Sequence, residues 1–249
     1  MRGTGDANQL APPWPSELQK ATMKLRKETE NRRHGRWYDD ACGTAFALEL
    51  IGERWSLLIV RELMLGGRRF TELRAGLPGI SAKVLTERLA GLEGAGILRR
   101  RKLAPPAASQ IYELTPWGYA AEEPVKLLGA WAAKSPKHDP TLPLSPASFM
   151  ISLRTMFDPA LAEGLLVSGA LNIGDESFLV AVASSALRAE RGDIDAPDFT
   201  LSAPTATPLA AAVYGKVPVE ALAGAGVRLA GDPAAIGRFI DLFHLPAKV

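Results

Sequence analysis

A segment that begins at Ser81 has the side chains expected of a helix that binds a polyanion. Ser81 is typical of a helix N-cap, because its hydroxyl can accept a hydrogen bond from the first turn. The inner stripe of this helix would be three leucines, Leu85, Leu89 and Leu92. With that stripe buried, the period of about 3.6 residues turns four side chains outward, Lys83, Thr86, Glu87 and Ala90. Arg88 then falls on the flank of the helix.

These residue types fit the major groove of duplex DNA, which admits one helix and is read by the N-terminal end of that helix. Lys83 and Arg88 can meet phosphate or guanine, and Thr86 can touch a thymine methyl or a base edge. Glu87 must accept from cytosine or be held away from the phosphates by a neighbouring cation. The sequence therefore predicts that this helix contacts base edges.

Basic side chains flank the helix on both sides. Four consecutive cations, Arg99 to Lys102, lie on a predicted strand, and strand alternation sends two of them to each face. We expect Arg99 and Arg101 to reach along the DNA backbone. Arg68 and Arg69, just before a shorter helix, are further expected phosphate contacts. The alternative interpretation of the basic strand alone is a solvated surface.

The elements that would position these residues occupy residues 37–134. Four helices are expected, ending near Gly52, at Gly66–Gly67, at Pro78–Gly79 and at Gly94. Two strands of a hairpin follow, Ile97–Leu103 and Ile111–Leu114. Thr115 caps a last helix that has Pro116 in its first turn. This order of elements predicts a winged helix-turn-helix domain.

The segments on either side of this domain have a different character. Residues 1–36 have no sustained apolar stripe, so we expect a mobile arm or a loosely held helix. The arm contains a basic cluster that either touches the DNA backbone or is solvated, Arg32, Arg33, His34 and Arg36. Residues 135–146 contain four prolines and are predicted to be a linker, because proline excludes helix and keeps the chain extended.

Residues 147–249 are predicted to form a second domain, of the α+β class. A helix is expected over Met156–Leu166. Four strands are expected, at Leu166–Ile173, Ser177–Ser184, Phe199–Ser202 and Val227–Ala230. Three further helices would begin at Thr207–Pro208, at Pro218 and at Asp232–Pro233. The chain as a whole is therefore expected to be α+β, with a winged helix followed by this domain.

Charge is divided unevenly between the two halves. Residues 1–135 hold 21 Lys and Arg against 15 Asp and Glu, whereas residues 136–249 hold 8 against 12. A basic front half and an acidic back half fit a polyanion-binding domain joined to a domain with a different task. Solvated surface charge is the simpler alternative.

The sequence argues against several classes of protein, namely membrane, secreted, metal-binding and catalytic proteins. No apolar run approaches the roughly 20 residues that cross a bilayer, and the start has no secretory signal pattern, so we expect a cytoplasmic protein without a membrane partner. The single cysteine excludes an intrachain disulfide and a multi-cysteine metal site. The three histidines are far apart, and neither a phosphate loop nor a nucleophile elbow is present. We expect no catalytic residues, no metal and no cofactor.

Motifs spread over residues 42–118 resemble those of the HxlR-type regulators. They are Cys42, Leu50-Ile51-Gly52-x-Arg54-Trp55, Arg69-Phe70-x-x-Leu73, Leu77-Pro78-Gly79-Ile80-Ser81, Lys83-Val84-Leu85-x-x-Arg88-Leu89 and Tyr112-x-Leu114-Thr115-x-x-Gly118. The resemblance implies a winged helix, a homodimer formed through the first and last helices of the domain, and a two-fold-related operator in double-stranded DNA. Gly43 departs from the pattern, because proline is common at that position.

Cys42 matches the position of the cysteine through which some members of that family sense electrophiles or oxidants. The resemblance therefore implies a redox sensor at Cys42 as one interpretation. A small buried cysteine in a dimer helix is the other.

Residues 147–249 resemble the sterol-carrier-protein type 2 fold in three short motifs, Ala196–Leu201, Tyr214–Lys216 and Gly226–Asp232. The resemblance implies a five-stranded sheet whose helices shelter an apolar ligand. Four apolar side chains of the predicted helices would either line such a cavity or fill a solid core, Leu209, Val213, Phe239 and Phe243. A ligand in that cavity would be an apolar small-molecule or lipid effector.

Together these features predict a sequence-specific DNA-binding transcription regulator, a repressor that acts as a homodimer, with control by an apolar ligand as a further hypothesis. Two alternatives stay open. One is a redox- or electrophile-sensing regulator acting through Cys42. The other is a lipid-binding or interaction protein whose winged helix does not read DNA.

Overall fold

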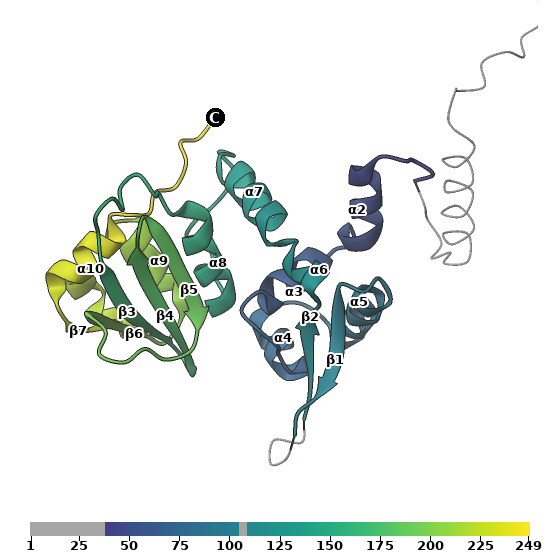
Figure 1. The fold of residues 1–249 in the computed structure, drawn as a ribbon, viewed down its shortest axis with the longest axis horizontal. Coiled ribbons are helices and arrows are strands. Elements are labelled where there is room, and N and C mark those ends of the chain that lie inside the picture. Colours follow the sequence, from purple (N-terminus) through teal and green to yellow (C-terminus); the bar gives the residue numbers. More distant parts are fainter. Residues whose placement is uncertain (1–37, 105–108) are drawn as a thin grey trace, which may run out of the picture. The chain divides into compact units, whose positions relative to one another are not determined.

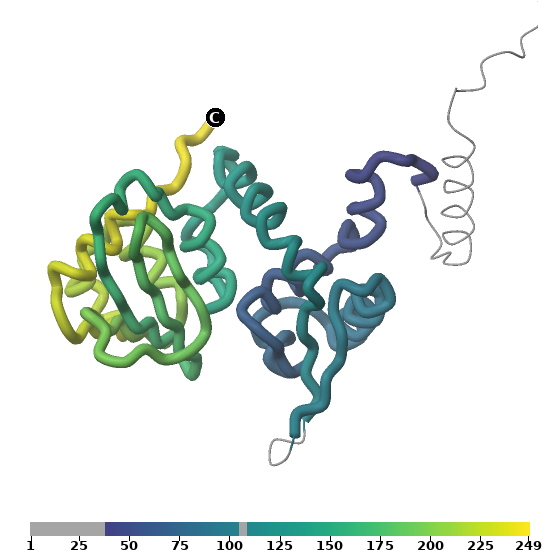
Figure 2. The backbone as a smooth tube through the Cα atoms, viewed as in Figure 1, coloured from purple at the N-terminus to yellow at the C-terminus, as the bar shows by residue number. Residues whose placement is uncertain are grey.

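The computed structural model describes residues 38–104 and 109–249 (Figures 1 and 2). The chain divides into two compact units, residues 1–49 and 50–249. The arm predicted for residues 1–36, with its basic cluster, lies outside the described residues, as does the wing tip at 105–108. Helix α2, Gly43–Ile51, begins directly after Cys42, and its Phe46 and Leu48 side chains are exposed. The leading helix is therefore where the periodicity predicts it.

The helix-turn-helix region of the larger unit consists of α3 (Ser56–Leu63), α4 (Phe70–Gly76) and α5 (Ala82–Gly94). Apolar side chains at helical spacing make their common core, Ile59, Leu63, Leu73, Leu85 and Leu89, all 2% exposed or less. These three predicted helices are confirmed. Trp55 differs from the expectation, because it lies before α3 with a left-handed φ of 81° instead of inside the helix.

The wing is an antiparallel hairpin of β1 (Leu98–Lys102) and β2 (Gln110–Leu114), in which Leu98 faces Leu114. A third piece of chain joins it, because the backbone of Arg68 forms an antiparallel bridge with Tyr112 of β2. Two hydrogen bonds of 2.8 Å connect these residues, one in each direction. The segment between α3 and α4 is thus fixed to the wing.

The single helix expected after the wing is divided into α6 (Pro116–Tyr119) and α7 (Glu122–Ala133). Thr115 caps α6 as predicted, since its hydroxyl accepts from the backbone N–H of Gly118 at 3.1 Å. A Cβ on Gly118 would lie 2.1 Å from the carbonyl oxygen of Ile97, so only glycine permits this close approach to the wing. Pro124 lies in the first turn of α7 and has no N–H to continue α6, so the helix restarts there.

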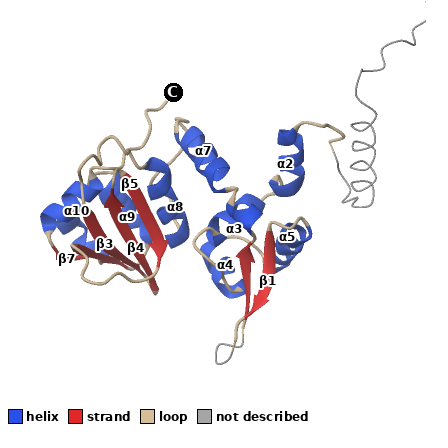
Figure 3. Ribbon diagram, viewed as in Figure 1, coloured by secondary structure: helices blue, strands red, loops and turns tan. Residues whose placement is uncertain are grey.

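The C-terminal half contains a five-stranded sheet and the helices that pack on it (Figure 3). Its helices are α8 (Pro146–Met156), α9 (Ala206–Tyr214), α10 (Pro233–Ile240) and the 3-10 helix η1 (Val219–Ala225). Its strands are β3 (Val167–Ile173), β4 (Glu176–Ala183), β5 (Ala186–Arg191), β6 (Phe199–Ala203) and β7 (Arg228–Gly231). The order across the sheet is β5-β4-β3-β6-β7, with β3 and β6 parallel and the other neighbours antiparallel.

Two expectations for this half are wrong. The helix expected over Met156–Leu166 lies one helix length earlier, because the hydroxyl of Ser145 caps the N–H of Ser148 and Pro146 occupies the first turn of α8. The last proline of the predicted linker therefore begins a helix. Strand β5 is absent from the predicted elements, because Ser184 and Ser185 make its hairpin turn at positive φ without the usual glycine or asparagine.

The interior of the C-terminal half is closely packed. The four side chains predicted to line a cavity or to fill a core, Leu209, Val213, Phe239 and Phe243, are 2% exposed or less. The ring of Phe239 lies 5.4 Å from the ring of Phe199 and 4.9 Å from that of Phe243, centroid to centroid. Aromatic pairs at these distances are in contact, so the core interpretation is favoured.

Two kinds of feature are absent from residues 38–104 and 109–249. These residues contain no helix long and apolar enough to cross a membrane. In the same residues no group of three or more His, Cys, Asp or Glu side chains is arranged to hold a metal ion.

Candidate nucleic-acid interface

Helix α5 has the predicted division between a buried and an exposed face. The hydroxyl of Ser81 accepts from the N–H of Val84 at 3.2 Å, which confirms the N-cap. Leu85, Leu89 and Leu92 are 0%, 2% and 1% exposed. The opposite face is exposed at the expected positions, Lys83, Thr86, Glu87 and Ala90. The helical period therefore predicts the right orientation, while contact of these side chains with DNA stays a prediction.

The hydroxyl of Thr86 is already committed within the helix. It donates to the carbonyl oxygen of Ala82 at 2.9 Å, one turn earlier. A hydroxyl has one proton, so Thr86 retains only acceptor capacity and its methyl group for a ligand. In the major groove these would meet the amino group of cytosine or adenine, or the methyl group of thymine.

Arg88 braces the helix from its flank. Its guanidinium forms an ion pair with Glu53 at 3.0 Å and donates from Nε to the carbonyl oxygen of Arg54 at 3.2 Å. Both partners lie in the turn before α3, so Arg88 fixes α5 to that turn. Arg88 is predicted to contact phosphate or guanine. To do so it would first have to give up its bonds to Glu53 and to the carbonyl oxygen of Arg54.

The wing arginines alternate between two faces as predicted, and each of them meets a carboxylate. Arg99 and Arg101 both pair with Glu113 of the opposite strand at 2.8 Å. Arg100, on the other face, pairs with Glu93 of α5 at 2.6 Å. Partial burial would raise the pKa of Glu113, but the hydrogen bonds from Arg101 and Arg99 outweigh it and hold that pKa below its usual range. The wing therefore carries anions among its cations.

Arg68 and Arg69 are neighbours with different surroundings. Arg69 is exposed, and its Nε donates to the hydroxyl of Ser109, the residue before β2 at the tip end of the wing, at 3.0 Å. Arg68 is only 8% exposed, and its guanidinium pairs with Glu176 of β4 at 2.6 Å. Because this side chain is buried against the C-terminal half, the expectation that Arg68 contacts phosphate is corrected. No sequence signal indicated Glu176, which lies 108 positions away.

Cys42 is exposed immediately before α2. Its backbone N–H donates to the carboxylate of Asp40 at 2.9 Å. Hydrogen bonds from the backbone N–H groups of Thr44 and Ala45 lower the pKa of the Cys42 thiol. This environment differs from that of a small buried cysteine, the other interpretation of this residue.

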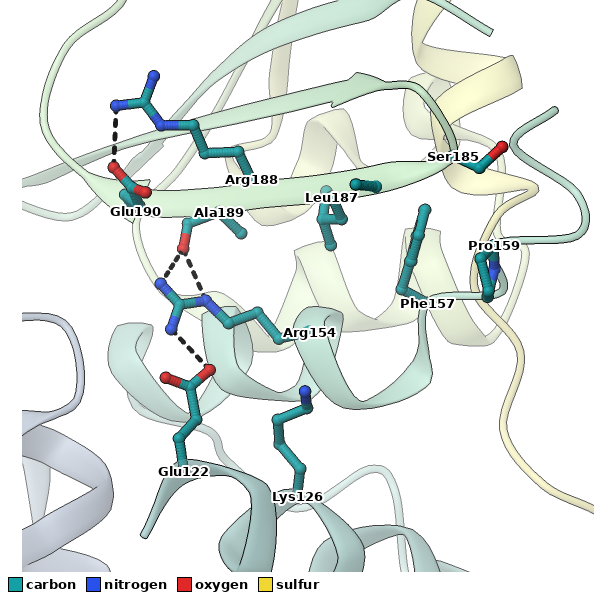
Figure 4. Close-up of a pocket in the computed structure, with 11 residues that line it drawn as sticks. Glu122, Lys126, Arg154, Phe157, Pro159, Ser185, Leu187, Arg188, Ala189 and Glu190 are labelled. Carbon is teal, nitrogen blue, oxygen red and sulfur yellow. Dashed lines mark hydrogen bonds and ion pairs between the residues drawn. The ribbon is translucent and has the colours of Figure 1, made fainter. Parts of the chain in front are cut away.

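A groove of about 470 Å³ lies where α7 and α8 meet strand β5 (Figure 4). The guanidinium of Arg154 crosses it, donating to Glu122 of α7 at 2.8 Å and to the carbonyl oxygen of Ala189 of β5 at 2.9 Å. Phe157 and Leu187 supply apolar wall on the other side. None of the four side chains expected around a ligand cavity lines this groove.

Comparison with known proteins gives a consistent result for the helix-turn-helix region. The family model described as HxlR-like helix-turn-helix matches residues 50–139. The HTH-type transcriptional regulator YodB of Bacillus subtilis (strain 168) is 41% identical over 86 residues, which are 34% of this chain and 77% of that protein. YvaP of the same strain, an HTH-type transcriptional regulator, is 35% identical over 88 residues, 35% of this chain and 82% of that protein.

A solved structure, the reduced form of YodB from B. subtilis, is also similar. It has 36% sequence identity, covers 40% of this chain and 100% of its own, and superposes with a TM-score of 0.36.

The pairing in the wing leads to a prediction for Glu113. Glu113→Gln leaves Arg99 and Arg101 without their shared anion, so we expect tighter binding to duplex DNA. The slope of log K against log salt should steepen by about 0.9 for each additional phosphate that the freed arginines neutralise. Fluorescence anisotropy over a salt series measures both quantities. Glu190→Gln is the matched control, because its partner Arg188 lies on β5. Identical curves for Glu113→Gln and the unmodified protein would show that this face of the wing does not approach DNA.

Proposed function

Because this chain belongs to the HxlR-like helix-turn-helix family and is a DNA-binding transcriptional regulator, we propose that α5 is the element that reads its operator in the major groove. One observation carries this proposal: the N-terminal half of α5 is capped, exposed and polar, and its leucine face is buried. The proposed base-reading residues are Lys83 and Thr86, with Ser81 at the cap. The proposed phosphate contacts are Arg69, Arg88, Arg99 and Arg101.

The chemistry of these side chains limits what α5 recognises. The ammonium of Lys83 donates and suits guanine or phosphate, whereas Thr86 accepts or offers its methyl group. The hydroxyl of Ser81 accepts from Val84, so its proton remains available for a phosphate oxygen beside the helix N-terminus. Arg88 and the wing arginines reach phosphate by exchanging an intrachain carboxylate for it.

We further propose that the regulator is a homodimer formed through α2 and α7, acting as a repressor. The apolar side chains of α7 are unusually exposed, with Leu127 at 68%, Leu128 at 47% and Trp131 at 72%. Phe46 and Leu48 of α2 are 43% and 49% exposed. Exposed apolar groups of this size mark contact surfaces. A two-fold dimer would place two copies of α5 on half-sites about one helical turn apart.

For the C-terminal half we propose a sterol-carrier-protein-like domain, which its five-stranded sheet and packed helices support. Its apolar core argues against the effector cavity at Leu209, Val213, Phe239 and Phe243, because these side chains are buried against one another. The proposal therefore includes no lipid effector at that place. It assigns no catalytic role to any residue.

A second candidate function, thiol-based sensing, is favoured by the surroundings of Cys42. The thiol is exposed, and the backbone N–H groups at the start of α2 lower its pKa. A larger thiolate fraction at neutral pH makes a cysteine more reactive towards electrophiles. This function is compatible with DNA binding, since the thiol would act as the input and α5 as the output.

The central experiment replaces the two proposed base-reading residues. Lys83→Ala with Thr86→Ala should lower affinity for the operator at least about tenfold, because each base contact is worth about 1–3 kcal/mol. Footprinting on DNA upstream of its own gene locates the operator, and anisotropy titrations measure affinity. The control, Lys137→Ala with Thr141→Ala, removes the same side-chain types from the linker. Full operator preference in the first variant would reject α5 as the reading helix.

The dimer proposal predicts the effect of a charge on α7. Trp131→Glu should give a monomer that binds the operator weakly, because a carboxylate in an apolar interface is desolvated without a partner. Analytical ultracentrifugation reports the mass of the particle. Leu161→Glu, at a residue of the C-terminal half that is 51% exposed, should leave the mass unchanged. A dimeric Trp131→Glu protein would place the interface elsewhere.

The sensing candidate predicts the pH dependence of alkylation at Cys42. Its pKa is lowered, so the thiolate persists to lower pH than in an ordinary cysteine. The rate of iodoacetamide labelling, measured by mass spectrometry, should therefore rise with pH, and the midpoint of that rise should lie at a lower pH than for free cysteine. Labelling of the urea-unfolded chain provides the reference, since Cys42 is the one cysteine in the sequence. A folded-state midpoint at or above the unfolded one would argue against a sensor.

A further inference from the structure

A half-buried charge cluster joins the helix-turn-helix region to the C-terminal half. The carboxylate of Glu176, the first residue of β4, accepts from Arg68 through Oε1 at 2.6 Å. Its other oxygen, Oε2, accepts from Arg191 at the end of β5. Nε of Arg191 in turn donates to the carbonyl oxygen of Leu65, just after α3, at 3.4 Å. One carboxylate therefore connects two strands of the sheet with the segment between α3 and α4.

This cluster is attached directly to the wing. The backbone of Arg68 exchanges two hydrogen bonds with Tyr112, the central residue of β2. Immediately afterwards, Arg69 is the N-cap residue of α4, and its backbone N–H donates to the carboxylate of Glu72 at 2.8 Å. Arg68 is thus bonded to the wing and lies one residue before the N-cap of α4, which shares its apolar core with α5.

The composition of the cluster indicates a positioning role instead of a purely adhesive one. Two guanidinium groups share one carboxylate, and Nε of Arg68 and Nη2 of Arg191 are buried without a hydrogen-bond partner among the described residues. Buried ion pairs carry a large desolvation cost, and apolar side chains often stabilise such a site at least as well. What the charges add is a fixed geometry, because removing one partner leaves the others uncompensated.

A second polar contact supports the same interpretation. Glu62 of α3 is 1% exposed, and its Oε1 accepts from the hydroxyl of Ser145 at 2.7 Å. Ser145 is the N-cap of α8, the first helix of the C-terminal half. The helix-turn-helix region is therefore held at both ends of the α3–α4 connection by directional bonds.

We propose that Glu176 is a positioning residue for DNA recognition: through Arg68 it fixes the wing and α4 in the arrangement in which α5 and the wing engage the operator together. The C-terminal half thus acts as a brace whose state sets operator affinity, without contacting DNA through this cluster. The inference rests on the proposed function, because it concerns the geometry with which α5 and the wing meet DNA.

The test compares Glu176→Gln with Glu190→Gln, a glutamate of the same domain that pairs with Arg188 on β5. Glu176→Gln should lower operator affinity about fivefold or more, the lower end of typical coupling between sites. The salt slope should be unchanged, because no phosphate contact is removed. Amide hydrogen exchange in residues 110–114 should accelerate, because the bonds between Arg68 and Tyr112 loosen. Glu190→Gln should change none of these quantities.

An exchanged pair provides a rescue. Arg68→Glu with Glu176→Arg restores opposite charges between these two positions, and Arg191→Gln in the same variant removes the cation that would otherwise repel the new guanidinium. This variant should slow amide hydrogen exchange in β2 again and recover part of the lost affinity, and it also serves if Glu176→Gln alone does not fold. A folded exchanged pair that recovers neither property would overturn the proposal.

Other outcomes are equally decisive. Normal affinity and normal exchange in a folded Glu176→Gln protein would overturn the inference. Tighter binding with a steeper salt slope would also overturn it, since it would mean that Glu176 withholds Arg68 from phosphate. If the unmodified protein showed no operator preference, the proposed function would fail instead. The comparison of amide hydrogen exchange in β2 between Glu176→Gln and the unmodified protein would then still decide whether Glu176 positions the wing.

Discussion

Ion pairs within the chain hold the arginines around α5 in place before any DNA is present. Glu53 holds Arg88, Glu93 holds Arg100, and Glu113 holds both Arg99 and Arg101. Exposed pairs of this kind contribute little to the free energy of unfolding. Their effect is to select one rotamer of a long side chain, so that the cations lie on defined faces of the wing and of α5. The interface is therefore preorganised by its own anions.

The same anions limit how strongly the wing attracts DNA. If Arg99 and Arg101 contact phosphate as proposed, each contact would weaken a bond to Glu113, and the attraction that does not depend on sequence would be reduced. Lys83 forms no ion pair among the residues that the structure describes, although Glu87 lies one turn along the same exposed face. A larger share of the binding free energy would then fall to the residues of α5 that are proposed to face the bases. Such a balance would favour discrimination between sequences over general affinity for DNA.

The orientation of α5 and of the wing could be predicted from the sequence because local periodicity determines both. A stripe of leucines at helical spacing defines the buried face of α5, and strand alternation separates Arg99 and Arg101 from Arg100. The carboxylate partners could not be predicted in this way. Glu113 meets Arg99 only because the hairpin register places the two residues opposite each other. The loop between the two strands contains Pro105 and Pro106, which predict a turn but do not specify that register.

The errors in the C-terminal half have local causes. Four prolines favoured a linker up to residue 146, but Ser145 and Pro146 are also a good beginning for a helix, and α8 starts there. Strand β5 is rich in charged residues because it lies at the edge of the sheet, so its pattern resembles a helix face more than a strand. Whether Phe239 lines a cavity or fills a core depends on ring contacts between distant segments, which no local pattern contains.

Arg68 and Arg69 show how far purely local chemistry determines a residue's role. Both are adjacent cations before a helix, and local chemistry assigns both the same role. The backbone of Arg68, however, pairs with Tyr112 as a strand, and Arg69 continues in the extended conformation with a ψ of 158°. Successive side chains of an extended chain point to opposite sides. Arg69 therefore stays at the surface beside the wing, while Arg68 turns inward, where a carboxylate from the C-terminal half must balance its charge. Glu176 supplies that carboxylate, so the fold of the second half determines which of the two arginines remains available to DNA.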